Sequence, residues 1–215
     1  MLMSGLAGLI DHTLLKSNIN KQQIESLCAD AIENEFAAVC IPPYYVSNAA
    51  TLLKDSNVKV ATVIGFPMGY ATLFAKVEEI KRAIQDGADE IDAVLNISAV
   101  KDGSWNYVTN EIQSFTRAAH LKGKILKLII EAAVLTDEQI QKVCEIANAE
   151  KVDFVKTSTG YNGGATAEMV SQLKMYLNDS IKIKASGGIR TKAQAISLID
   201  AGAQRIGTSA SIDII

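Results

Sequence analysis

The chain has 215 residues, 48% of them hydrophobic and 21% charged, and its formal charge at pH 7 is −3. These values are ordinary for a globular protein, the length fits one domain or two very small ones, and the few prolines argue against a disordered chain. No long basic run occurs, so the sequence offers no electrostatic support for a nucleic-acid or membrane-surface partner.

The cysteines and the N-terminal segment indicate the compartment. Cys28, Cys40 and Cys144 are odd in number, far apart and without a Cys-x-x-Cys pair, so we expect neither a disulfide framework nor a zinc site. Residues 1–10 are apolar but lack a basic start, and they are far fewer than the ~20 residues of a spanning helix. We interpret them as the lead-in to the first strand and expect a cytoplasmic protein.

Short runs rich in β-branched residues alternate along the chain with longer segments of helical period. In chain order the expected strands are Leu9–Leu14, Ala37–Ile41, Val58–Ile64, Glu90–Leu95, Ile125–Glu131, Phe154–Thr157, Ile181–Lys184 and Arg205–Gly207. The helices expected between them include Lys21–Glu33, Leu73–Asp86, Thr136–Asn148, Ala165–Leu177 and Lys192–Asp200. Several strands are apolar enough to be buried on both faces, which indicates a parallel sheet.

This alternation predicts an α/β fold, namely a single compact (β/α)8 TIM barrel that spans residues 1–215 as one domain. A doubly wound open sheet is the alternative. Its dinucleotide-binding form is disfavoured because no Gly-x-Gly-x-x-Gly follows the first strand. Only residues 208–215 follow the last strand, so the final helix is expected to be very short or missing. Apolar surface left open there would favour a homodimer.

In such a barrel, side chains alternate between the lumen and the helix layer, and catalysis occurs at the carboxyl ends of the strands. With Lys156 pointing inward, the polar side chains expected to share the lumen are Asp11, Thr13, Glu90, Asp92, Lys127, Glu131, Lys182, Lys184 and Ser186. So much charge is costly in a passive core unless it is paired. The alternation therefore predicts a functional site inside the barrel.

Two strands deliver a lysine that is followed at once by small polar residues and glycine. The runs are Phe154-Val155-Lys156-Thr157-Ser158-Thr159-Gly160 and Ile181-Lys182-Ile183-Lys184-Ala185-Ser186-Gly187-Gly188. A buried ammonium is costly unless it is paired or its pKa falls, and imine-forming enzymes require a lysine of lowered pKa. Lys156, Lys184 and Asp92 are therefore the candidates for chemistry, and the pattern favours an aldolase that works through a lysine Schiff base.

The other charged or thiol side chains have more than one interpretation. Asp11 and Glu131 are either satisfied interior groups or supporting catalytic groups, and Lys127 is expected to be their ion-pair partner rather than a nucleophile. Cys40 stands at the end of the second strand, close enough to approach the site. Lys182 lies either in the lower lumen or in solvent.

Glycine-rich turns follow the last two strands, where barrels of this kind commonly hold a phosphate with backbone N–H groups. The turns are Ser186-Gly187-Gly188-Ile189 and Gly207-Thr208-Ser209-Ala210-Ser211, and Thr159-Gly160-Tyr161 is positioned to complete one wall. The expected phosphate-binding residues are Gly160, Gly187, Gly188, Gly207, Thr208 and Ser209. The segment 66–70 either borders this site or is a plain turn at the rim.

Several longer segments occur in a fixed order along the chain. They are Ile10-Asp11-His12-Thr13-Leu14-Leu15-Lys16, Val39-Cys40-Ile41-Pro42, Ile64-Gly65-Phe66-Pro67-Met68-Gly69, Gly87-Ala88-Asp89-Glu90-Ile91-Asp92, Leu126-Lys127-Leu128-Ile129-Ile130-Glu131, Phe154-Val155-Lys156-Thr157-Ser158-Thr159-Gly160 and Lys184-Ala185-Ser186-Gly187-Gly188-Ile189-Arg190-Thr191. With these segments the chain resembles the 2-deoxyribose-5-phosphate aldolase family over essentially its whole length. Such an ordered set is more specific than any one motif, and the resemblance implies a (β/α)8 barrel.

The resemblance implies that Lys156 forms the Schiff base, that Asp92 is a proton donor and acceptor, and that Lys184 handles protons and lowers the pKa of Lys156. The residues placed around them in supporting roles are Asp11, Thr13, Cys40 and Lys127. The implied reaction is reversible cleavage of 2-deoxy-D-ribose 5-phosphate to D-glyceraldehyde 3-phosphate and acetaldehyde, in deoxyribose phosphate catabolism. Neither a metal nor another cofactor is implied.

The sequence departs from the pattern of the family at two places. Lys182 stands where a small or apolar residue is expected, and the C-terminal tail is brief. Two other functions remain open at this stage. One is a phosphosugar isomerase or synthase on the same barrel, with Asp92 or Glu131 as the base and no imine. The other is a catalytically silent protein that binds a phosphorylated ligand.

Overall fold

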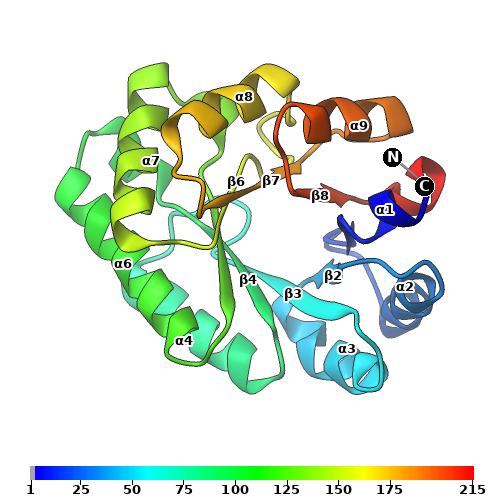
Figure 1. Ribbon diagram of the computed structural model, residues 1–215. Coiled ribbons are helices and arrows are strands. Elements are labelled where there is room, and N and C mark those ends of the chain that lie inside the picture. Colours follow the sequence, from blue (N-terminus) through cyan, green and yellow to red (C-terminus); the bar gives the residue numbers. More distant parts are fainter. Residues whose placement is uncertain (1–2) are drawn as a thin grey trace.

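The computed structural model of the protein describes residues 3–215 and contains eight parallel strands that close into a barrel (Figure 1). The strands are β1 (Ile10–Thr13), β2 (Ala38–Ile41), β3 (Lys59–Ile64), β4 (Glu90–Val94), β5 (Ile125–Ile129), β6 (Phe154–Lys156), β7 (Lys182–Ser186) and β8 (Arg205–Thr208). Each strand pairs with its sequence neighbours, and β8 pairs with β1. This arrangement confirms the predicted (β/α)8 barrel and excludes the open doubly wound sheet.

Helices surround the barrel on its outside (Figure 1). They are α1 (Met3–Ala7), α2 (Lys21–Glu33), α3 (Val46–Leu53), α4 (Leu73–Gln85), α5 (Ile97–Lys101), α6 (Trp105–His120), α7 (Asp137–Glu150), α8 (Ala167–Tyr176), α9 (Lys192–Asp200) and α10 (Ser211–Ile214), with short 3-10 turns η1 (Pro43–Tyr45) and η2 (Ala132–Val134). The last helix has only 4 residues, as the short C-terminal segment predicts. Across residues 3–215, no helix is long and apolar enough to cross a membrane.

Local signals account for the start of several helices. Asn20, Thr136 and Thr191 each form a capping box with the glutamine three residues later, so that two orphan backbone N–H groups are satisfied. The predicted bounds of α2 and α9 are confirmed, and those of α4, α7 and α8 differ by one or two residues. The helices α3, α5 and α6 lie in parts of the chain for which no helix bounds were predicted. A short helix, α1, occupies part of the predicted lead-in, whose residues 1 and 2 lie outside the described residues.

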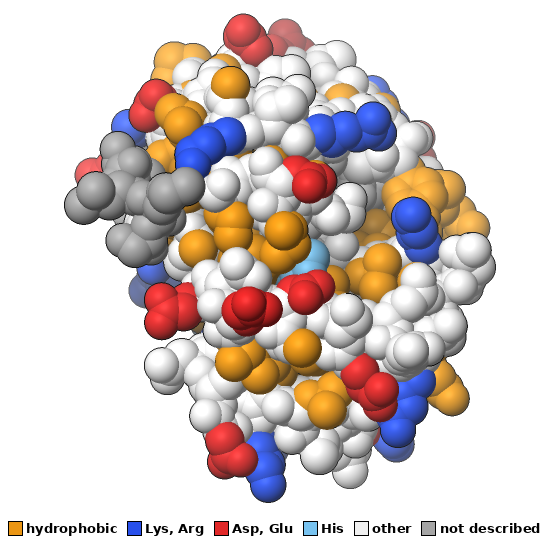
Figure 2. All heavy atoms as spheres, turned by 90° about the vertical axis from the view of Figure 1, so that its right-hand side faces the viewer, with side chains coloured by type: hydrophobic (Ala, Val, Ile, Leu, Met, Phe, Trp, Pro, Cys, Tyr) orange, Lys and Arg blue, Asp and Glu red, His pale blue; other side chains and the backbone are white. Residues whose placement is uncertain are grey.

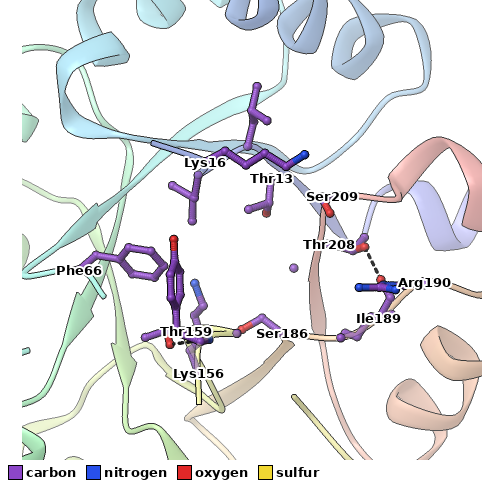
Figure 3. Close-up of a pocket in the computed structure, with 17 residues that line it drawn as sticks. Thr13, Lys16, Phe66, Lys156, Thr159, Ser186, Ile189, Arg190, Thr208 and Ser209 are labelled. Carbon is purple, nitrogen blue, oxygen red and sulfur yellow. Dashed lines mark hydrogen bonds between the residues drawn. The ribbon is translucent and has the colours of Figure 1, made fainter. Parts of the chain in front are cut away.

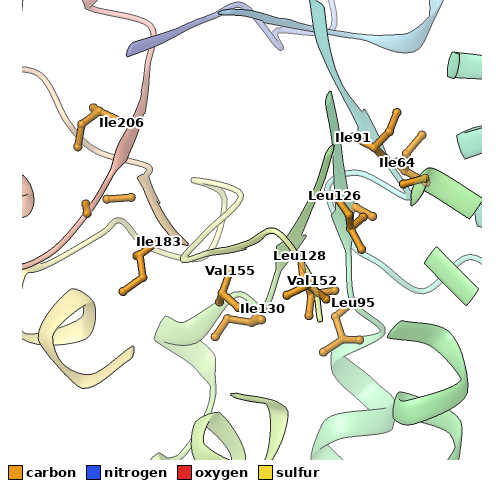
Figure 4. Close-up of a cluster of buried hydrophobic side chains, with 14 of the residues drawn as sticks. Ile64, Ile91, Leu95, Leu126, Leu128, Ile130, Val152, Val155, Ile183 and Ile206 are labelled. Carbon is orange, nitrogen blue, oxygen red and sulfur yellow. The ribbon is translucent and has the colours of Figure 1, made fainter. Parts of the chain in front are cut away.

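The main hydrophobic core lies between the barrel wall and the helices, where outward-facing strand side chains pack (Figure 4). Its members on the strands include Ile64, Ile91, Leu128, Val155, Ile183 and Ile206. The lumen is different, because β2 and β3 contribute only small apolar side chains to it, Ala38, Cys40, Ala61 and Val63. The charged side chains of the lumen come from the other six strands.

The surface that carries α1, α2 and the C-terminal end has both hydrophobic and charged side chains exposed (Figure 2). Hydrophobic side chains lie there in separate groups between charged ones. Ile32 of α2, Ile196 of α9 and Ile212 of α10 are 46%, 40% and 49% exposed. Some apolar surface is therefore open on this flank, and the expected homodimer stays a prediction.

A fully buried ion pair lies outside the lumen, between α4 and α6. The ammonium of Lys76 is 2.7 Å from Oε1 of Glu111, and neither side chain has exposed surface. Lys76 also donates to the carbonyl oxygens of Gly69 (2.6 Å) and Val94 (3.1 Å), and Glu111 accepts from the backbone N–H of Asn96 (2.7 Å). The pair therefore ties the loop after β3 to the carboxyl end of β4.

We expect Lys76→Met to lower the free energy of unfolding by about 3–5 kcal/mol, because it leaves the Glu111 carboxylate buried without its cation. The double variant Lys76→Met/Glu111→Leu should recover most of that loss, since both charges are then removed. Lys81→Met is the control, because Lys81 pairs with Glu78 on the exposed surface and should contribute less than about 1 kcal/mol. Urea unfolding measures all three, and equal losses for the two single variants would contradict the assignment.

Candidate active site

Six strands send charged side chains into the lumen, and Asp92 of β4 lies at their centre. Oδ1 of Asp92 is 2.7 Å from Nζ of Lys127 on β5. Oδ2 is 2.8 Å from Nζ of Lys156 on β6 and 2.7 Å from Nζ of Lys184 on β7. The strand register explains this, since Asp92 lies beside Lys127 and Lys156 lies beside Lys184. Two lysines therefore share one carboxylate oxygen, which connects them by charge-assisted hydrogen bonds.

A second layer of charge lies toward the amino ends of the strands. Asp11 accepts a hydrogen bond from Lys184, and its Oδ2 is 3.3 Å from Nζ of Lys127. Glu90 lies 2.6 Å from the same Nζ of Lys127. The Arg205 guanidinium is 2.6 Å from Asp11 and 3.3 Å from Glu90. Each carboxylate of the lumen thus faces at least two cations, so the buried charge is paired as its desolvation cost requires.

Burial is the largest single influence on the pKa values of the lumen lysines and lowers all of them. The neighbouring carboxylates decide whether the net shift is downward or upward. For Lys156, burial and the neighbouring Lys184 ammonium lower the pKa, and Asp92 offsets them only in part. For Lys184, burial works in the same direction, but Asp11 and Asp92 outweigh it and raise the pKa. The pKa of Lys127 is raised well above its usual value in the same way. Lys156 is therefore the lysine of the lumen most available as a free amine.

The carboxylates show the reverse balance. Burial alone would raise the pKa of Asp92, but Lys127, Lys156 and Lys184 hold it well below its usual value. The pKa of Asp11 is also lowered, by Lys127, Lys184 and Arg205 against the effect of burial. Both groups are carboxylates near neutral pH.

A cavity of about 320 Å³ opens at the carboxyl ends of the strands (Figure 3). The side chain of Lys156 points into it (Figure 3). Within residues 3–215, Lys156 is the one charged side chain of the lumen that lines this cavity. Asp92, Lys184, Asp11 and Lys127 lie behind it in the lumen and do not line the cavity.

The residues expected to bind phosphate surround the same cavity. The six that line it are Gly160, Gly187, Gly188, Gly207, Thr208 and Ser209, and Thr13, predicted in a supporting role, lines it too. Two exposed cations that the prediction did not include, Lys16 and Arg190, line it as well (Figure 3). Both lie in loops within the quoted segments, where no side-chain alternation could have marked them.

Comparison with known proteins places this geometry in a family. A family model described as DeoC/LacD family aldolase matches residues 6–212. The deoxyribose-phosphate aldolase of Desulfitobacterium hafniense is 48% identical over 98% of this chain and 97% of its own length. Deoxyribose-phosphate aldolase 1 of Vibrio vulnificus is 49% identical over 96% of this chain and 94% of its own. The chain belongs to the DeoC/LacD aldolase family.

The fold gives the same relationship. The tetrameric deoxyribose phosphate aldolase from Aeropyrum pernix superposes with a TM-score of 0.93 at 31% identity, covering 99% of this chain and 90% of that one. The family match begins before β1 and ends after β8, so it includes the whole barrel. Membership confirms the resemblance carried by the ordered sequence segments, and the chain is accordingly an enzyme of the carbon–carbon lyase class.

Glycine is required at two positions in the cavity wall of this aldolase. Gly187 has a φ of +89°, and an added Cβ would lie 3.0 Å from Cα of Gly160 and 3.1 Å from the carbonyl oxygen of Gly163. On β8, a Cβ added to Gly207 would lie 3.0 Å from Cε of Lys184. The first glycine therefore lets two loops approach each other, and the second leaves room in the lumen for the stem of Lys184.

Aromatic side chains form a different part of the wall. Phe66 lies across the cavity from Thr208 and Arg190 (Figure 3). Its ring meets that of Tyr161 edge-on, with the centroids 5.7 Å apart. Of the two interpretations of segment 66–70, the structure thus favours the one that places it beside the site, and Leu15 lines the cavity too.

Glu131 does not take the lumen position that strand alternation predicts. β5 ends at Ile129, and Glu131 has a left-handed φ of 51°, so the alternation stops before it. Its carboxylate instead accepts hydrogen bonds from the backbone N–H (3.1 Å) and the hydroxyl of Thr159 and from the Asn162 amide (3.3 Å). Glu131 therefore holds the loop that carries Tyr161, and the prediction that it shares the lumen with Lys127 is wrong.

The remaining predicted residues lie close to the cluster or clearly outside it. Sγ of the fully buried Cys40 is 3.9 Å from Oδ2 of Asp92, and burial raises the pKa of this thiol. The hydroxyl of Thr13 donates to the carbonyl oxygen of Asp11 (2.9 Å). Lys182 is exposed at the amino end of β7, which resolves its two interpretations in favour of solvent.

Proposed function

We propose that this aldolase reversibly cleaves 2-deoxy-D-ribose 5-phosphate to D-glyceraldehyde 3-phosphate and acetaldehyde through a Schiff base on Lys156. One observation carries the proposal, namely that the lysine with the lowered pKa in the paired lumen cluster is the one that opens to the cavity. The names of the curated relatives support the same substrate. We assign the reaction to the catabolism of deoxyribose phosphates.

The neutral Nζ of Lys156 attacks the aldehyde carbon C1 of the open-chain sugar and forms a carbinolamine. Loss of water gives an iminium, which acts as an electron sink. The C2–C3 bond then breaks as the C3 hydroxyl gives its proton through a water to Asp92, which releases glyceraldehyde 3-phosphate and leaves an enamine on the lysine. Protonation at C2 and hydrolysis release acetaldehyde and restore the amine. Because the iminium accepts the electrons, the proposed reaction requires neither a metal nor an organic cofactor.

We assign proton transfer to Asp92 and Lys184. Oδ2 of Asp92 accepts hydrogen bonds from Lys156 and Lys184, and Lys184 also donates to Asp11. Lys184, with its raised pKa, carries the proton as an ammonium, and the shared oxygen of Asp92 passes it toward the substrate through a water. Lys127 and Asp11 keep this pair in place, and Cys40 and Thr13 fill the lumen beside it.

The phosphate group is assigned to the glycine-rich end of the cavity. There the backbone N–H groups and hydroxyls that would contact it belong to Gly160, Gly187, Gly188, Gly207, Thr208 and Ser209. Lys16 and Arg190 add positive charge at the rim. Binding at this remote end fixes the position of C1 over Lys156, so binding energy contributes to orientation.

The isomerase alternative has less support, because both carboxylates considered as its base are occupied. Glu131 is engaged by Thr159 and Asn162, and neither Glu131 nor Asp92 lines the cavity, so neither carboxylate can take a proton from a bound sugar directly. A catalytically silent binding protein would have no use for the lowered pKa of Lys156. Measurable turnover distinguishes the enzyme from that alternative.

Borohydride reduction in the presence of 2-deoxyribose 5-phosphate or acetaldehyde, followed by peptide mass spectrometry, tests the proposal. We expect a reduced adduct on the peptide that contains Lys156. An adduct on Lys184 would keep the aldolase chemistry and exchange the two lysine roles. No adduct from a folded protein that binds the phosphorylated sugar would overturn the Schiff-base mechanism.

We expect Lys184→Leu to raise the pKa of Lys156, because it removes an ammonium that shares an oxygen of Asp92 with it. The pH at which half of Lys156 can be trapped should therefore move upward, and the acid limb of the rate profile should move with it. Trapping across a pH series measures this directly and does not depend on the turnover that Lys184 also supports. An unchanged pH midpoint for trapping would show that Lys184 does not lower the pKa of Lys156.

We also propose that the chain is a single-domain, cytoplasmic enzyme that forms a homodimer. The free cysteines Cys28, Cys40 and Cys144 fit a reducing compartment. The tetrameric state of the Aeropyrum pernix relative shows that this kind of barrel can self-associate. Light scattering of the purified protein should give twice the mass of the chain, and a monomer at micromolar concentration would contradict the dimer.

A further inference from the structure

Arg205 lies at the floor of the lumen, where its guanidinium holds two carboxylates side by side. One nitrogen is 2.6 Å from Oδ1 of Asp11 and 3.3 Å from Oε2 of Glu90, and the other is 3.3 Å from Oε1 of Glu90. The guanidinium also lies over the ring of Phe154, 5.6 Å from its centroid. The side chain is only 15% exposed, so these contacts are largely shielded from water.

Of the two carboxylates, Asp11 connects Arg205 to the lysines nearer the cavity. Oδ2 of Asp11 accepts a hydrogen bond from Lys184, and Lys184 reaches Oδ2 of Asp92 at 2.7 Å. The same Asp92 oxygen is bonded to Lys156 at 2.8 Å. A continuous row of ion pairs therefore runs from the floor arginine to the lysine that opens to the cavity.

The charge of the lumen balances only when one cation is neutral. The carboxylates are Asp11, Glu90 and Asp92, and the cations other than Lys156 are Lys127, Lys184 and Arg205. These two sets cancel, so Lys156 is left as the free amine. Without Arg205 the carboxylates would outnumber the cations, and proton uptake by Lys156 would restore the balance.

Several charged or titratable groups surround each end of this row, Lys156 at the cavity and Arg205 at the floor. Lys156 is faced by Asp92 from β4, Lys184 from β7 and the Cys40 thiol from β2. Lys16 and Arg190 line the cavity beside it but are exposed, so solvent screens their effect.

Around Arg205 lie Asp11 from β1 and Glu90 from β4. Lys127 of β5 contacts the same Oε2 of Glu90, and Lys184 of β7 lies beside Arg205. Lys182 of β7 shares the ring of Phe154 with Arg205, at 5.6 Å from its centroid, but contacts neither carboxylate. It is therefore the natural control for a charge at the floor.

We propose that Arg205 is a positioning residue of the reaction, which holds Asp11 and Glu90 so that Lys184 stays an ammonium at Asp92 and Lys156 stays a neutral nucleophile. This inference rests on the proposed Schiff-base function. Arg205 lies outside the cavity and touches no reacting atom. Its effect is therefore on the protonation of Lys156 and not on the binding of the phosphorylated sugar.

The test compares Arg205→Met with Lys182→Met in borohydride trapping with acetaldehyde across a pH series. Arg205→Met should raise the pH midpoint for the adduct on Lys156 by about one unit, which is about a tenfold loss of free amine below the midpoint. Lys182→Met removes a floor charge outside the row and should leave the midpoint in place. KM for 2-deoxyribose 5-phosphate should stay within about twofold of the wild type in both, because no cavity residue changes.

Two further variants separate the electrostatic role from a structural one and cover the case in which Arg205→Met does not fold. Glu90→Gln removes a carboxylate and should lower the midpoint, and Arg205→Met/Glu90→Gln should bring it back toward the wild type. A midpoint that moves in neither single variant, or a Glu90→Gln shift of the same sign as that of Arg205→Met, would overturn the inference. Absence of any adduct on wild-type Lys156 would instead contradict the proposed function.

Discussion

Lys156→Ala is expected to lose cleavage of 2-deoxyribose 5-phosphate by about four orders of magnitude or more. No other lumen lysine opens to the cavity within residues 3–215, so none can replace it as the nucleophile. The loss should appear in kcat, because the glycine-rich end that would hold the phosphate is untouched. Coupled assay of released glyceraldehyde 3-phosphate measures the rate, and calorimetry with the phosphorylated sugar measures binding.

The variant is also expected to fold. Lys156 is the lumen lysine whose pKa is lowered, so its removal leaves the carboxylates with their other cations. Lys182→Met, which changes a solvent-exposed lysine on the next strand, is the matched control and should keep full activity. Ordinary activity in folded Lys156→Ala would disprove the central mechanism.

Asp92→Asn should slow the exchange of acetaldehyde methyl protons with solvent by about 10²- to 10⁴-fold. The exchange requires the enamine to gain and lose a proton at C2, and the amide cannot pass protons between Lys184 and the substrate as the carboxylate does. The change also removes the anion that three lysine side chains contact, two of them as ammonium groups. We therefore expect a loss of about 3–5 kcal/mol in the free energy of unfolding.

Deuterium incorporation followed by NMR measures this exchange without the phosphorylated substrate. Asp86→Asn is the control, because Asp86 pairs with Arg82 on the outside of the barrel and lies away from the cavity. Wild-type exchange in folded Asp92→Asn would remove the carboxylate from proton transfer. Unfolding of the variant would also stop the exchange. The measurement is therefore made without urea and at a temperature at which the variant is folded.

The barrel and much of its lumen could be predicted from sequence, because strand side chains alternate with a strict period of two. Once Lys156 is placed inward, that period brings Asp11, Asp92, Lys127 and Lys184 to the same interior. The rule holds only while the strand continues. Glu131 lies two residues past the end of β5, in a left-handed conformation that no periodicity signals.

Other members of the site depend on tertiary packing. Arg205 begins a short strand, and only its contacts with Asp11 and Glu90 reveal that it belongs to the lumen. Lys76 and Lys81 both lie on α4, yet the first is fully buried and the second exposed. The helical period of α4 places Lys76 on the buried face with Ile80 and Ala83, but its pairing with Glu111 depends on how α4 packs on α6.

One part of the cavity wall is formed by main chain and another part by side chains. At Gly187 and Gly207 its wall is main chain in close contact, so any larger residue there would displace a loop or the stem of Lys184. At Leu15, Phe66 and Tyr161 the wall consists of side chains, and the rings of Phe66 and Tyr161 are in contact. If the glycine-lined part binds the phosphate as proposed, we expect substitutions at the side-chain part of the wall to change which compounds this aldolase accepts, while the phosphate stays bound in the same place.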